Sequence, residues 1–233
     1  MRAQLADIVW QNDLLVAVDK APGVLTVPGR QGADDPRPVL GVWLQEQLGH
    51  RLWPVHRLDF EVSGIVVFAR TADAHRVANR AFESRRVSKT YVALTTLAGA
   101  PARGTPVSWA SKLVRGKKRS FEAPHGQLAR THAVSVGPVD AATAGAFASV
   151  APLCGWRLQP ETGKPHQLRV HLANAGHPIA GDTLYGGPAV DSAAGIALRS
   201  IELVFTDAED ARALQVTSPL RVPMRWWVEP VTP

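Results

Sequence analysis

Short runs of apolar, often β-branched residues recur along the whole chain and alternate with turn-forming glycines and prolines. Such runs are typical of β-strands. We expect strands at residues 14–18, 24–27, 65–68, 90–96, 156–159, 167–172, 200–205 and 226–228. Residues 98–108 are expected to form a connecting loop, and residues 137–145 the connection of a hairpin. Because strands are many and helices few, the sequence predicts an α+β fold with a mixed, mostly antiparallel central sheet flanked by helices and loops.

Two segments carry the signals of amphipathic helices. An apolar stripe with helical spacing predicts one helix that ends at Gly49. The stripe consists of Leu40, Trp43, Leu44 and Leu48. A second helix is expected from an N-cap at Thr71 to Arg86, with Asp73 in its first turn and arginines in its last.

Composition limits the class of protein. Of the 233 residues, 45% are hydrophobic, as is ordinary for a globular chain. We expect one sizeable domain, or two fused lobes, over residues 1–233. Cys154 is the only cysteine, so an internal disulfide is impossible and a cytoplasmic location is expected. No apolar run reaches the roughly 18 residues of a membrane helix. Lys and Arg exceed Asp and Glu by 26 − 20 = 6, which indicates either a nucleic-acid partner or a solvated basic surface.

Charged residues lie inside strand-like runs at three places. If residues 56–59 are extended, Arg57 and Asp59 share one face, which indicates either a site or a structural ion pair. As a strand, residues 167–172 would place Gln167, Arg169 and His171 on a polar face. If Arg169 is buried, it needs an acidic partner, for which Asp59 is a candidate. Tyr91 follows Lys89 in a third run, where core packing is the alternative.

Three motifs, in this order, resemble those of RluA-type RNA pseudouridine synthases. The first is His-Arg-Leu-Asp at 56–59, followed by Ser63-Gly64. The second is Lys-Thr-Tyr-Val-Ala at 89–93. The third begins at Gly163, contains His-Gln-x-Arg-Val-His-Leu at 166–172, and is followed by Gly-His-Pro-Ile-x-Gly-Asp-x-x-Tyr-Gly at 176–186. The resemblance runs from about residue 13 to about residue 205, which leaves no room before it for a small S4-type RNA-binding domain.

The resemblance implies an isomerase that converts uridine to pseudouridine in ribosomal or transfer RNA without a metal or cofactor. It implies that Asp59 is the essential carboxylate, that Tyr91 packs on the target base, and that Arg169 pairs with Asp59. In the family the arginine of the first motif, here Arg57, fills the space left by the flipped base. A monomer is expected, with RNA as its partner.

Further RNA contacts are expected from basic and polar side chains of the motifs and of one basic cluster. The expected RNA-binding residues are His56, Arg57, Lys89, Lys117, Lys118, Arg119, Lys164, His166 and Gln167. For the cluster, which also contains Lys112 and Arg115, a solvated hairpin is the alternative. Val62, Lys164-Pro165 and the order of residues 20–23 depart from the family pattern and affect the expected RNA contacts more than the chemistry.

Two other functions compete with this interpretation. A non-catalytic RNA-binding or RNA-folding protein could use the same scaffold, because a fold does not dictate a function. A metal hydrolase is suggested by His166, His171 and His177, with Asp182 nearby. The five-residue separation of His166 and His171, on opposite faces of a strand, argues against a metal.

Overall fold

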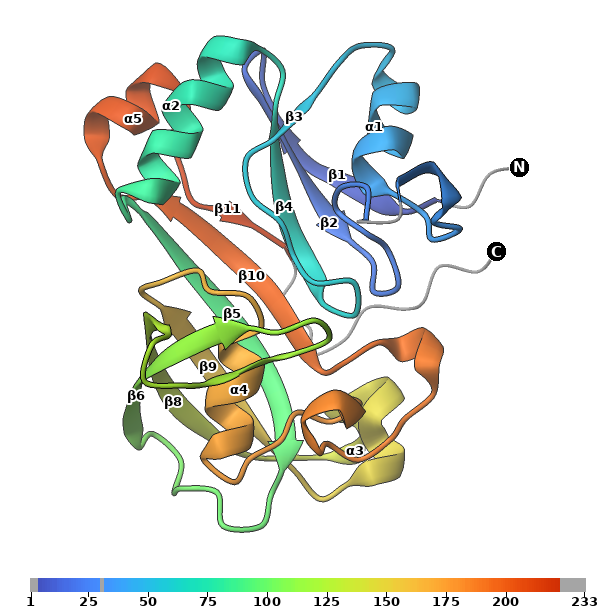
Figure 1. Ribbon diagram of the computed structural model, residues 1–233, viewed down its shortest axis with the longest axis vertical. Coiled ribbons are helices and arrows are strands. Elements are labelled where there is room, and N and C mark those ends of the chain that lie inside the picture. Colours follow the sequence, from blue (N-terminus) through green and yellow to red (C-terminus); the bar gives the residue numbers. More distant parts are fainter. Residues whose placement is uncertain (1–3, 30–31, 223–233) are drawn as a thin grey trace. The chain divides into compact units, whose positions relative to one another are not determined.

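The computed structural model describes residues 4–29 and 32–222, and in these ranges the chain divides into two compact units. Unit 1 contains the described residues up to Ser88 and those from Ser200 onward, and unit 2 spans Lys89–Arg199. Strands and helices occur in both units (Figure 1), which confirms the predicted α+β class. No helix in the described ranges has the length and apolar content to cross a membrane. The expected strand at 226–228 lies outside the described residues.

Unit 1 is built on the strand order β1-β2-β4-β10, with β3 added to β4 and β11 added to β10. The strands are β1 (Ala6–Gln11), β2 (Leu15–Lys20), β3 (Trp53–Pro54), β4 (Ser63–Ala69), β10 (Leu198–Phe205) and β11 (Leu220–Arg221). All seven residues of β4 are buried, which explains why its sequence is almost entirely apolar. β2 and β4 pair antiparallel, with Val18 opposite Val66. Residues 24–27, expected to be extended, form only an isolated bridge at Leu25.

The two predicted helices both lie in unit 1. Helix α1 (Leu40–Leu48) ends at Gly49, which has a left-handed φ of 71° as the sequence predicts. Helix α2 (Ala72–Glu83) begins at the predicted cap, where the Thr71 side chain accepts a hydrogen bond from the Ala74 amide. It ends three residues before the predicted Arg86, because Arg85 adopts φ 58° and the strand β5 starts at Val87. A 3₁₀ turn, η1 (Gly32–Asp34), and the short helix α5 (Ala208–Ala213) complete unit 1.

Unit 2 has the strand order β5-β9-β8-β6-β7, in which each strand pairs antiparallel with its neighbours. The strands are β5 (Val87–Thr96), β6 (Pro106–Arg115), β7 (Ser120–Glu122), β8 (Gln127–Val139) and β9 (Leu153–Pro160). The connection predicted at 137–145 does lie between the antiparallel strands β8 and β9. It is longer than predicted, because it consists of helix α3 (Ala141–Ala144) and the 3₁₀ turn η2 (Gly145–Val150), and residues 137–139 still belong to β8. The 3₁₀ turns η3 (Thr183–Tyr185) and η4 (Ser192–Ala194) follow later.

The predicted strand at 167–172 is wrong, because these residues form helix α4 (Gln167–Asn174). Its side chains from Gln167 to Leu172 are all buried, and the helix contacts β6, β7 and β8. A helix that is buried on every side has no polar stripe from which its period could be recognised. The predicted common face of Gln167, Arg169 and His171 therefore does not exist, and neither does the strand on which His166 and His171 were placed on opposite faces.

Candidate functional site

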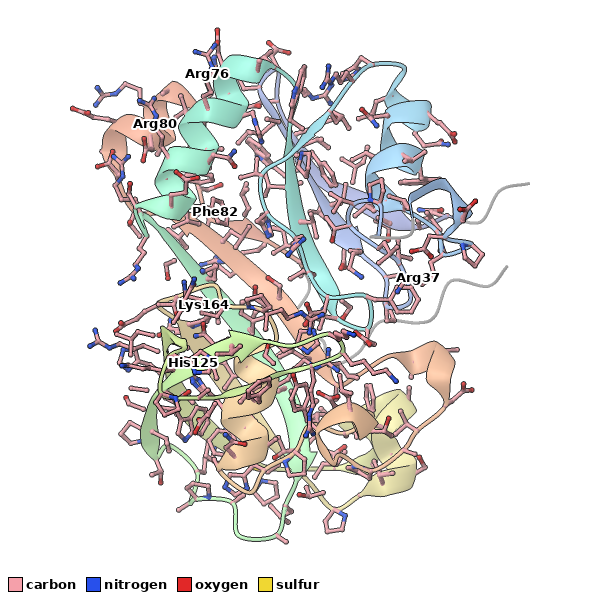
Figure 2. The ribbon with its side chains drawn as sticks, viewed as in Figure 1. Arg37, Arg76, Arg80, Phe82, His125 and Lys164 are labelled. Carbon is pink, nitrogen blue, oxygen red and sulfur yellow. The ribbon has the colours of Figure 1, made fainter. Side chains whose placement is uncertain are left out.

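The His-Arg-Leu-Asp motif lies in unit 1 as an irregular segment between β3 and β4. Its first residue is fixed from two sides. The Val67 amide donates to His56 Nε2 at 3.1 Å, so this nitrogen carries no proton and Nδ1 does. The imidazole also stacks on Phe82, with ring centroids 4.9 Å apart. Figure 2 shows Phe82 near the C-terminal end of α2. We infer that His56 positions the segment.

Two more residues of this segment are held through their backbones. Thr26 Oγ1 accepts a hydrogen bond from the Leu58 amide and donates one to the Leu58 carbonyl, both at 3.2 Å. The Phe60 carbonyl accepts from the Gly23 amide at 2.9 Å. The turn at 21–23, where Gly23 has φ 73°, thus holds the backbone that follows the His-Arg-Leu-Asp motif.

Anchoring at every second residue determines which side chains the segment displays. His56, Leu58 and Phe60 are held, whereas Arg57 is exposed and Asp59 is partly exposed. The Val62 amide donates to the Asp59 carbonyl at 3.2 Å and closes the turn after the carboxylate. Unit 1 therefore brings together the two motif residues that carry charge and could act on a ligand.

A fully buried lysine lies beneath the same segment. Lys20 is 0% exposed, and its ammonium donates to the carbonyls of Ala21 at 2.9 Å, Val24 at 2.8 Å and Phe60 at 3.3 Å. Burial lowers the pKa of Lys20 to about 7, opposed by the negative charges of Glu61 and then Asp59. The sequence indicated Lys20 only as part of a motif with an altered order. The structure shows it joining the 21–24 turn to the Asp59 segment.

In unit 2, Arg169 of α4 forms a buried bidentate ion pair with Asp182. Its Nε and one terminal nitrogen each donate to a different carboxylate oxygen at 2.7 Å, and the two side chains are 2% and 0% exposed. A guanidinium fits a carboxylate in this geometry without strain. Asp182 is therefore an acidic partner of Arg169 that sequence reasoning missed, although it lies in the Gly-Asp-x-x-Tyr-Gly stretch that follows the third motif. The pairing of Arg169 with Asp59 stays a prediction.

Gln167 holds the turn before α4. Its amide nitrogen donates to the Arg130 carbonyl at 2.8 Å and to Thr131 Oγ1 at 3.0 Å. Its amide oxygen accepts from Thr162 Oγ1 at 2.7 Å and from the Lys164 amide at 3.0 Å. These four bonds use the whole capacity of the amide, and Gln167 is 4% exposed. It has no donor or acceptor left for RNA, so the structure favours a supporting role over the predicted contact.

The remaining predicted residues of unit 2 lie on strands and turns. Tyr91 is half-buried on β5, opposite Leu158 of β9. Lys89 Nζ lies 3.7 Å from the place that a Cβ on Gly163 would take. Lys164 donates to Gln127 Oε1 at 2.7 Å (Figure 2). Their roles stay predictions.

The basic cluster forms the end of a hairpin. Lys112 and Arg115 belong to β6, and residues 116–119 connect it to β7. The side chains of Arg115, Lys117, Lys118 and Arg119 are all exposed. We call residues 115–119 the basic turn.

His166 occupies an unusual backbone conformation at the start of α4. Its φ of 55° is left-handed, which is uncommon for a residue with a side chain and often marks a functional site. Its Nδ1 lies 2.9 Å from the Tyr185 hydroxyl. Within residues 4–29 and 32–222, no three His, Cys, Asp or Glu side chains gather as metal ligands would.

Comparison with known sequences identifies relatives over most of the chain. Residues 14–174 match the family model described as RNA pseudouridylate synthase. The dual-specificity RNA pseudouridine synthase RluA of Vibrio vulnificus is 33% identical over 207 residues, which are 85% of this chain and 77% of that protein. The tRNA pseudouridine synthase C of Haemophilus ducreyi is 30% identical over 77% of this chain and 74% of its own length.

Another relative is longer than the matched region. An uncharacterized RNA pseudouridine synthase of Bacillus subtilis is 32% identical over 78% of this chain, and the match covers 58% of that protein. Among solved structures, human RNA pseudouridylate synthase domain containing 1 superposes with a TM-score of 0.70 at 22% identity, covering 98% of this chain and 90% of that one. At this identity the structural likeness supports the fold alone. The sequence matches go further, and the chain belongs to the family of RNA pseudouridylate synthases, isomerases that act on uridines in RNA.

Proposed function

We propose that this chain isomerises specific uridines of ribosomal or transfer RNA to pseudouridine, with Asp59 as the essential carboxylate. The observation that carries the proposal is the way the Asp59 segment is held. Three alternate residues fix the backbone, and the carboxylate between them stays accessible. A pre-positioned group is what catalysis by proximity requires.

The chemistry needs no co-reactant. The bond from C1′ to N1 breaks, a bond from C1′ to C5 forms, and the proton lost from C5 is balanced by one gained at N1. An ionised carboxylate can act as nucleophile or base in such a rearrangement. In this proposal Tyr91 packs against the base and Arg169 supplies a fixed positive charge. The buried pair with Asp182 supports that role, because it fixes the guanidinium in one orientation.

Substrate binding is proposed to use exposed basic groups. The basic turn presents four cations, and Arg57 adds another beside Asp59. Cations of this kind bind the phosphate backbone whatever the base sequence. A relative named as a tRNA pseudouridine synthase supports transfer RNA as a substrate, and one named as a dual-specificity RNA pseudouridine synthase supports more than one RNA substrate.

The test compares wild-type protein with Asp59→Asn on purified tRNA and rRNA fragments, with pseudouridine mapped at each uridine. We expect the variant to form no pseudouridine and to bind RNA as the wild type does. Asp73→Asn is the matched control, because it removes an exposed carboxylate from α2. Undiminished turnover by Asp59→Asn would refute the role of the carboxylate. Absence of activity in the wild type on both RNAs would favour the non-catalytic RNA-binding function instead.

A further inference from the structure

One side chain of unit 2, Tyr185, connects the basic hairpin with helix α4. Its hydroxyl accepts a hydrogen bond from the Ser120 amide at 2.8 Å and lies 3.1 Å from the Ser120 carbonyl. The same oxygen lies 2.9 Å from His166 Nδ1 at the start of α4. Ser120 is the first residue of β7 and directly follows the basic turn. Three contacts therefore meet at a single oxygen atom.

Counting protons shows how all three contacts are satisfied together. A phenol has one proton to donate and can accept two hydrogen bonds. If Tyr185 donates to the Ser120 carbonyl, it can accept from the Ser120 amide and from a protonated His166 Nδ1. A tyrosine hydroxyl keeps its proton at neutral pH, and burial raises the pKa of Tyr185 further in the same direction.

The ring of the same tyrosine contacts two residues of the third motif. The Arg169 guanidinium carbon lies 5.2 Å from the ring centroid, within the range of a cation–π interaction. The His166 ring meets it edge to face at 5.7 Å. Arg169 is held on its other side by Asp182. The ring thus touches two residues of the third motif while the hydroxyl holds the hairpin.

The position of β7 explains why such a junction is needed. β7 has three residues and lies at the end of the strand order of unit 2, so none of the described strands pairs with its outer edge. Backbone N–H and C=O groups on the outer edge of a sheet normally form hydrogen bonds with water, and short edge segments open easily. The tyrosine hydroxyl binds both backbone groups of Ser120 in place of a strand.

We propose that Tyr185 is a positioning residue that couples docking of RNA on the basic turn to the placement of His166 and Arg169. Ser120 and Tyr185 then connect the basic turn to Arg169, so that RNA bound to the turn is held in a fixed position relative to Arg169. The inference rests on the proposed function, since it assigns the basic turn to RNA and Arg169 to the reaction.

The kinetic test uses Tyr185→Phe, which keeps the ring and removes the hydroxyl. We expect kcat at saturating RNA to fall roughly tenfold, equivalent to about 1.4 kcal/mol in barrier, with RNA affinity within about twofold of wild type. Ser108→Ala is the control, because it removes an exposed side-chain hydrogen bond from β6 and should leave kcat unchanged. A wild-type kcat in Tyr185→Phe would overturn the proposal.

A double-mutant cycle separates coupling from simple loss of packing. In the wild type, replacing Lys117 and Lys118 by alanine should weaken RNA binding and lower kcat. In the Tyr185→Phe background the same replacement should weaken binding only, because the hairpin no longer acts on α4. If the lysine replacement lowers kcat by the same factor in both backgrounds, the two sites are independent, and the coupling is refuted.

Hydrogen exchange tests the junction without any variant. We expect the Ser120 amide of the wild-type protein to exchange much more slowly than the amides of residues 117 and 118. Exchange as fast as in the turn would overturn the proposed junction. Because this readout needs no turnover, it distinguishes failure of the junction from failure of the proposed activity.

Discussion

Asp182→Asn probes the buried ion pair that anchors Arg169. In the wild type the side chain of Arg169 is 2% exposed and that of Asp182 is 0% exposed. The change therefore leaves a buried guanidinium next to a neutral amide. Removing one member of such a pair costs about 3–5 kcal/mol, because the remaining charge stays buried without the carboxylate that balanced it. For a chain of this length each kcal/mol shifts Tm by about 2–4 °C. We therefore expect Tm to fall by roughly 6–20 °C.

The measurement is urea unfolding at pH 7, followed by circular dichroism, together with a thermal melt. Asp73→Asn is the matched control, because it removes an exposed aspartate from the ion pair with Arg76 and should cost less than about 1 kcal/mol. Replacing both Arg169 and Asp182 by leucine should recover stability relative to either single replacement, since neither charge of the pair is then left buried without the other. A loss below about 1 kcal/mol in Asp182→Asn, against the roughly 3–5 kcal/mol expected, would refute the reasoning.

Three further changes test the other parts of the site. His56→Phe should keep the stack on Phe82 but leave the buried Val67 amide without an acceptor, so we expect a loss of about 1–3 kcal/mol in urea unfolding together with slower turnover. Because burial lowers the folded pKa of Lys20 to about 7, the unfolded state binds more protons than the folded state between pH 7 and about 10.5. The stability of the wild type relative to Lys20→Met should therefore rise with pH across this window, and a stability difference that does not change with pH would contradict the lowered pKa. Replacing Lys117, Lys118 and Arg119 by glutamate should weaken the binding of all RNAs alike. The slope of log affinity against log salt should become shallower by about 0.7–0.9 for each phosphate group that the turn no longer neutralises. An unchanged slope would favour the alternative that the basic turn is a solvated hairpin.

Local sequence signals were sufficient where the environment of a segment is simple. Helix α1 with its stop at Gly49, the cap at Thr71 and the buried strand β4 all follow from patterns within about ten residues. In each case one face, one cap or complete burial determines the element, so a neighbouring strand or helix cannot change the result.

The signals were insufficient where the element is buried and polar at once. Residues 167–172 fit a strand by their alternation, and because all six are buried in helix α4, no competing helical period is visible in the sequence. Lys20 gave no sign of burial either, because its three acceptors are carbonyls, which every residue has. Such contacts depend on how the backbone folds back and not on which residue types follow one another.

The sequence by itself determined the α+β class, the family and the identity of the motif residues, because the kinds of side chain and their order along the chain are written in it. Only the tertiary structure decided what those side chains contact. It buried Lys20 beneath the Asp59 segment, paired Arg169 with Asp182, and placed Tyr185 between the basic turn and α4. A carboxylate, a carbonyl or an edge amide can satisfy many donors and acceptors, and only the three-dimensional path of the chain brings one of them within hydrogen-bonding distance.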